Sequence, residues 1–160
     1  MKYSDIRKTI KTGDVLAWSH RGWKSWYDIK IQMVRFFTQS EFSHVGLAII
    51  FGGRVWVLEA VTPKVRLVPL SNLLPCYVVS GNGLSHNSLE AGFDLIGKDT
   101  VNYSQSEAVK AYFKKNDRTN SAIQCAELVN SLLLLDCQDT PAATVECMLK
   151  NGSTLKEITK

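Results

Sequence analysis

A thiol, an imidazole and a carboxylate stand at positions where they could act together in nucleophilic chemistry. They are Cys125, His44 and Glu59. A cysteine becomes a strong nucleophile when a neighbouring base takes its proton, and a carboxylate behind that base fixes its tautomer. Each residue also has a plainer interpretation: an inert cysteine on a helix face, and a sheet-edge histidine with satisfied hydrogen bonds. The elements that carry the three side chains determine which interpretation applies.

A β-hairpin is the clearest local pattern in the chain. Two runs rich in β-branched and aromatic residues, 45–51 and 55–61, flank Gly52-Gly53, a pair typical of a two-residue turn. With such a turn, His44 and Glu59 lie on one face of the hairpin as diagonal neighbours, because side chains alternate along each strand. Diagonal neighbours lie ~7–8 Å apart at the backbone, which long side chains can bridge. A three-residue loop would instead place the two on opposite faces.

The residues around His44 predict how open its surroundings are. Gly46 lacks a side chain and Ala48 is small, so we expect an open shelf in front of the imidazole. Glu59 stands in the apolar run Val-Trp-Val-Leu-Glu-Ala-Val. Because an unpaired buried carboxylate is costly, Glu59 requires either solvent or a partner.

The segment around Cys125 predicts a helix that begins near the thiol. Ser121 and Gln124 have the spacing of a capping box, which places Cys125 in the first turn. The helix dipole and free N–H groups there favour a thiolate and could stabilise an oxyanion. Leu128 and Leu132 follow on the same helical face, so a buried, inert cysteine is the alternative.

The remaining cysteines and histidines carry weaker indications. We expect Cys76, Cys137 and Cys147 to be structural, and no Cys or His spacing resembles a zinc site, so neither a metal nor another cofactor is predicted. His20 and His86 stand in polar loop sequence, and His20 is a candidate substrate contact.

The composition is that of an ordinary globular protein. Of 160 residues, 45% are hydrophobic and 21% are charged, which predicts one domain over residues 1–160. The net charge of +4 comes from scattered basic residues, so no nucleic-acid partner is expected. The start of the chain lacks an apolar core and the apolar stretch 45–61 is interrupted. These features predict neither a signal peptide nor integral membrane association, and a cytoplasmic location with reduced thiols is the default expectation.

Strands are gathered in the first half of the sequence and helices largely in the second. Besides the hairpin, we expect strands within 13–18, 64–69 and 76–80, and helices over 25–38, 89–96, 107–115, 122–135 and 142–149. The helix over 25–38 is amphipathic. This segregation predicts an α+β fold, with a small antiparallel sheet packed on helices.

Four motifs in this order resemble the circularly permuted NlpC/P60 family of papain-like cysteine hydrolases, over roughly residues 10–150. The motifs are Gly13-Asp14-Val15-Leu16, Ser43-His44-Val45-Gly46, Val57-Leu58-Glu59-Ala60 and Cys125-Ala-Glu-Leu-Val129. Gly97 and Tyr103 suit the family's link before its helical half, and Thr140-Pro141 also has a counterpart. Where the family more often has Ser after the cysteine and an aromatic residue before it, this chain has Ala126 and Gln124.

The resemblance implies a papain-like fold and a catalytic triad. Cys125 would be the nucleophile, His44 the base and Glu59 the orienting residue, and the reaction would cleave an amide bond in a peptide or peptidoglycan fragment. The expected substrate-binding residues are Trp18, His20, Ser43 and Tyr103.

Two other functions stay open at this point. One is a lipid N- or O-acyltransferase of the related permuted type, for which segment 25–38 could serve a lipid substrate. The other is a catalytically silent binding or virion structural module. A phage- or host-cell-associated location is the alternative to the cytoplasmic one.

Overall fold

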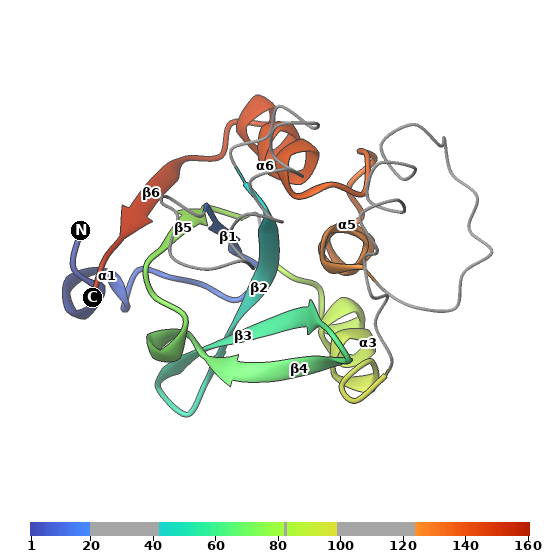
Figure 1. Ribbon diagram of the computed structural model, residues 1–160, viewed down its shortest axis with the longest axis horizontal. Helices are drawn as coiled ribbons and strands as arrows, with labels where there is room; N and C mark the ends of the chain where they lie inside the picture. Colours follow the sequence, from blue (N-terminus) through green and yellow to red (C-terminus); the bar gives the residue numbers. More distant parts are fainter. Residues whose placement is uncertain (20–41, 82, 99–123) are drawn as a thin grey trace, which may run out of the picture.

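The computed structural model describes residues 1–19, 42–81, 83–98 and 124–160. These residues form an α+β arrangement whose centre is an antiparallel sheet of six strands in the order β4-β3-β2-β1-β5-β6 (Figure 1). The predicted helices over 25–38 and 107–115 lie outside the described residues. The coarse prediction, an antiparallel sheet packed on helices, is confirmed.

The strands closely follow the predicted apolar runs. Their bounds are β1 Val15–Trp18, β2 His44–Phe51, β3 Arg54–Val61, β4 Lys64–Pro69, β5 Cys76–Val79 and β6 Leu155–Ile158. The last strand was not predicted, because its alternating polar residues stand far from the other strands in sequence. It pairs with β5 at one edge of the sheet.

The predicted hairpin register is confirmed. Phe51 pairs with Arg54, and the pairing continues without a slip to Leu47 opposite Leu58. Gly52 and Gly53 both have positive φ, 58° and 69°, as a tight hairpin turn with the twist of its strands requires.

The helices differ from the predictions mainly at their ends. Their bounds are α1 Tyr3–Ile6, α3 His86–Asp94, α5 Cys125–Leu133 and α6 Pro141–Lys150, with a 3₁₀ turn η1 at Leu70–Asn72. α3 begins earlier than predicted because the Ser85 hydroxyl caps it, accepting a hydrogen bond from the Ser88 N–H at 3.0 Å. His86 is therefore the first residue of this helix, and its prediction as a loop residue was wrong.

Apolar layers cover both faces of the sheet. On one face, Val45, Leu47 and Leu58 pack with residues of α5 and α6. On the other face, Ile6 of α1 and Leu70 of η1 cover Leu16, Ala48 and Val57. In Figure 1, α5 and α6 lie beside β2, and α1 lies with β6 near both chain ends.

The Gly13-Asp14 motif organises the entry to β1. The buried Asp14 carboxylate accepts hydrogen bonds from the N–H groups of Lys11 and Gly81, each at 2.8 Å. Gly13 has a positive φ of 94°, and a side chain there would meet the backbone carbonyl carbon of Gly83 at 2.6 Å. In this structure the motif therefore links the loop that enters β1 to the loop that leaves the neighbouring strand β5.

Candidate active site

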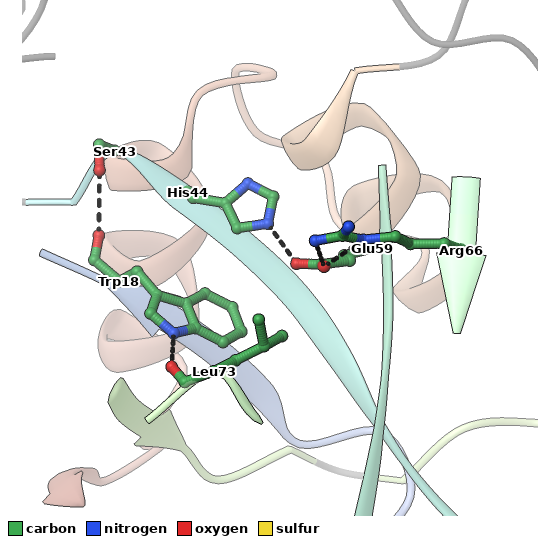
Figure 2. A network of polar contacts seen from close by, with 6 residues as sticks. All are labelled: Trp18, Ser43, His44, Glu59, Arg66 and Leu73. Atoms are coloured by element: carbon green, nitrogen blue, oxygen red, sulfur yellow. Dashed lines mark hydrogen bonds and ion pairs between the residues drawn. The ribbon is translucent and has the colours of Figure 1, made fainter. Parts of the chain in front are cut away.

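The imidazole of His44 and the carboxylate of Glu59 meet as the hairpin register predicts. His44 Nε2 lies 2.7 Å from Glu59 Oε2 (Figure 2). Glu59 is almost fully buried, with 2% of its side chain exposed, whereas His44 keeps 24% exposure. Because the carboxylate is ionised, Nε2–H donates this hydrogen bond, which leaves Nδ1 as the ring nitrogen available to another group.

Arg66 is a member of this cluster that the sequence analysis missed. Its Nε and one terminal guanidinium nitrogen donate to Glu59 Oε1 at 2.8 and 2.7 Å (Figure 2). Arg66 stands directly opposite Glu59 in the β3–β4 pairing. Counting paired positions across the next turn, into the strand predicted at 64–69, would have found it. Each Glu59 oxygen thus has its own cationic or hydrogen-bonding partner, which satisfies the buried carboxylate.

Cys125 is the first residue of α5 and lies beside the start of β2. The helix begins later than predicted, because Gln124 has an extended backbone and serves as the N-cap. The Glu127 carboxylate accepts a hydrogen bond from the Gln124 N–H at 3.3 Å. The capping residues are therefore Gln124 and Glu127, and Ser121, the predicted cap, lies outside the described residues.

The thiol and the imidazole lie close enough to shift each other's pKa. Burial by itself disfavours the imidazolium, but hydrogen bonds and charge interactions with Cys125 and Glu59 raise the pKa of His44 to about 9. Burial likewise disfavours the thiolate, but His44 and the backbone N–H groups of Val45 and Ala126 lower the pKa of Cys125. Together these opposite shifts favour a thiolate–imidazolium pair near neutral pH.

The Glu59 carboxylate stays charged in this setting. Burial opposes its ionisation, yet hydrogen bonds and charges from His44 and Arg66 lower the pKa of Glu59. A negative group therefore stands behind the imidazolium throughout the neutral range.

Trp18 and Ser43 flank His44, and two other predicted substrate contacts cannot be placed. The Trp18 ring lies 5.3 Å from the His44 ring between centroids, and its indole N–H donates to the Leu73 carbonyl at 2.7 Å (Figure 2). The Ser43 hydroxyl donates to the Trp18 carbonyl at 3.4 Å. Trp18 is thus a wall of the imidazole site. His20 and Tyr103 lie outside the described residues.

The expected open shelf in front of His44 was wrong. A Cβ on Gly46 would meet Val57 Cγ1 at 2.9 Å and Glu59 Cβ at 3.3 Å, and Ala48 is fully buried. Gly46 is therefore a close-packing position, where the absence of a side chain lets β3 bring Glu59 near.

The other thiols differ from Cys125 in their surroundings. Burial raises the pKa of Cys76 to about 12, in line with a structural role. All four cysteines are free. Among the described residues, no three His, Cys, Asp or Glu side chains gather as ligands for a metal ion.

Comparison with known proteins gives similarity at the level of structure. The sequence matches no protein-family model and no curated protein sequence. The fold is similar to the crystal structure of the metalloprotein yiiX from Escherichia coli O157:H7 (DUF1105), with a TM-score of 0.51 and 22% sequence identity. The match covers 76% of this chain and 63% of that protein, so the chain spans less than two thirds of its neighbour's length. Across the described ranges, no helix is long and apolar enough to cross a membrane. At this level of identity the similarity concerns the fold alone.

Proposed function

We propose that this protein is a cysteine hydrolase of the papain-like, permuted NlpC/P60 type, which cleaves an amide bond through an acyl-enzyme on Cys125. The observation that carries the proposal is the continuous polar chain from Cys125 through His44 to Glu59. A thiol paired to an imidazole, itself oriented by a carboxylate, is the arrangement that nucleophilic acyl transfer requires. The preferred substrate is a peptide or peptidoglycan fragment.

The chemistry follows from the proton positions in this chain. The Cys125 proton resides on His44 near neutral pH, so the thiolate attacks the substrate carbonyl directly. N–H groups at the start of α5, including that of Ala126, stand near the sulfur and would stabilise the oxyanion. His44 then gives its proton to the leaving amine, and water cleaves the thioester with His44 acting as base.

The neighbouring structure's description as a metalloprotein does not extend to this mechanism. Glu59 is engaged by His44 and Arg66, and the described residues gather no set of three ligands. We therefore derive no step through a metal ion.

Trapping of the acyl-enzyme tests the proposal. The protein is incubated with muropeptides, with peptide amides and with phospholipid vesicles, then quenched in acid and measured by intact mass spectrometry. A thioester adduct on Cys125 and released amine from a peptide or muropeptide support the hydrolase. The matched control is Cys147→Ser, which should keep the adduct, whereas Cys125→Ser should lose it.

Two other outcomes would overturn the proposal in favour of the alternatives. An adduct that forms only from phospholipid and passes to an amine or alcohol identifies an acyltransferase. If no substrate acylates Cys125 and Cys125 reacts with iodoacetamide no faster than Cys76, the site is not an activated pair and a binding module is the better description.

A further inference from the structure

A second pair of thiols lies away from His44, between α5 and α6. The Cys137 thiol lies close enough to the Cys147 thiol and the Thr144 hydroxyl for both to shift its pKa. Thr144 precedes Cys147 by three residues in α6, so the two share one helical face. Asn151 in turn donates to Cys147 Sγ at 3.9 Å. Cys137, which stands in the α5–α6 loop, therefore rests against the part of α6 that carries Cys147.

Buried hydrogen bonds fix the loop that carries Cys137. Asn130 of α5, only 3% exposed, donates through Nδ2 to the Gln138 carbonyl at 3.2 Å and to Asp139 Oδ1 at 3.0 Å. Its Oδ1 accepts from the Thr144 hydroxyl at 2.8 Å. One buried amide thus joins α5, the loop and α6. The backbone next to Cys137 is held in place against α6, which keeps the two thiols together.

These thiols differ from the other two cysteines in access and in position. Cys137 and Cys147 are half-buried, whereas Cys76 is 1% exposed. Cys125 is at the opposite end of α5 from the loop, and a nine-residue helix separates its ends by ~12 Å. The pair is therefore both reachable and independent of the nucleophile.

We propose that Cys137 and Cys147 are a reversible thiol-modification site, which a low-molecular-weight disulfide such as oxidised glutathione converts to an intramolecular disulfide. One protein thiolate attacks the small disulfide, forms a mixed disulfide and releases one glutathione thiol. The second protein thiolate then attacks the mixed disulfide and releases the other glutathione. Two protein thiols and one small disulfide thus give one protein disulfide and two small thiols.

The order of attack follows from the surroundings of the two sulfurs. Burial and the neighbouring Cys147 raise the pKa of Cys137 to about 12. Cys137 is accordingly the weaker first nucleophile, and Cys147 starts the exchange. Cys137 then resolves the mixed disulfide because it lies beside Cys147. The finished bond would close a short loop and restrict the unfolded chain, which raises the melting temperature by ~5–10 °C.

Oxidation of the full chain with its nucleophile removed tests this proposal separately from the proposed hydrolase activity. Cys125→Ser protein is incubated with oxidised glutathione, alkylated and mapped by mass spectrometry without reduction. We expect a Cys137–Cys147 cross-linked peptide, a higher melting temperature, and loss of both on reduction. Cys137→Ser protein should instead hold one glutathione on Cys147, and Cys147→Ser should react more slowly.

Either of two results overturns the proposal. One is stable glutathione adducts on both cysteines without a cross-link, which would show that the thiols cannot reach bonding geometry. The other is a cross-link that involves Cys76 and not this pair.

Discussion

Replacement of Glu59 by glutamine tests the central claim, that a buried carboxylate holds the proton on His44. Glutamine has nearly the same shape and can still accept a hydrogen bond from Nε2, so the change removes mainly the charge. The pKa of His44 is about 9 against an ordinary 6.5, a difference worth ~3 kcal/mol. Cys125 and Glu59 are the two partners that raise it. If Glu59 supplies about half, its loss costs ~1–2 kcal/mol, or roughly a tenfold smaller ratio of the thiolate–imidazolium population to the neutral one.

The rate of Cys125 alkylation by iodoacetamide, followed from pH 5 to 10 by peptide mass spectrometry, measures that population. In the unmodified protein we expect thiolate reactivity well below the ordinary pKa of a cysteine. In Glu59→Gln the rise should move to higher pH, and the rate near pH 7 should fall by as much as about tenfold.

A matched control exists in α3. Glu90 lies 3.3 Å from His86, and both side chains are largely exposed, at 66% and 80%. Glu90→Gln therefore removes an equivalent charge beside a histidine in water, where an ion pair contributes little, and should leave the Cys125 profile unchanged. Superimposable profiles for Glu59→Gln and the unmodified protein would refute the reasoning, provided that urea unfolding shows the variant folded.

Three further predictions concern the same region and its support. Arg66→Gln should lower the rate of Cys125 alkylation near pH 7 several-fold, and Arg66→Lys should restore part of that rate. The reason is that the positive charge, which favours the ionised form of the buried Glu59 carboxylate, matters more than the two parallel hydrogen bonds of the guanidinium. Equal rates in all three proteins would contradict this. Gly46→Ala should destabilise the fold by ~1–3 kcal/mol in urea, because the new methyl would overlap β3, whereas Gly53→Ala at the open turn tests backbone strain alone. Stability should also depend on pH: the contribution of His44, whose folded pKa is raised to about 9, is complete below ~6.5 and is lost as the pH rises through about 9. Because the lowered pKa of Cys125 adds stability over the same rise in pH, the loss from His44 should be measured by urea unfolding at pH 7 and pH 10 in Cys125→Ser protein. It should be smaller when Glu59→Gln is added to that variant.

Counting paired positions across a turn, a local arithmetic, was sufficient to predict the hairpin and the Glu59–His44 pair. The two residues are separated by a turn whose glycines allow one register, and alternation then determines the shared face. The same arithmetic could have reached Arg66, because it needs only the next two-residue turn. In the sequence alone, Arg66 stands among scattered basic residues and does not differ from a surface charge.

Packing between segments that are far apart in sequence could not be predicted by such counting. The sequence predicted empty space at Gly46 from the absence of a side chain, but the neighbouring strand fills it with Val57. The strand β6 was missed because its pairing with β5 joins residues that are far apart in sequence. Such contacts depend on how the whole chain folds, and propensity and spacing carry little information about them.

The contact between Cys125 and His44 shows why the thiol was hard to judge from sequence. The apolar residues of α5 pack on the sheet face that carries Val45 and Leu47, whereas alternation places the side chains of His44 and Glu59 toward the opposite face. A cysteine further along α5 would be buried on the face of β2 opposite the His44 side chain. Because α5 begins at Cys125, its thiol lies at the end of β2, within reach of the Val45 N–H and the imidazole. The apolar face that favoured an inert cysteine is therefore what docks the helix, and the helix start is what makes Cys125 available to His44.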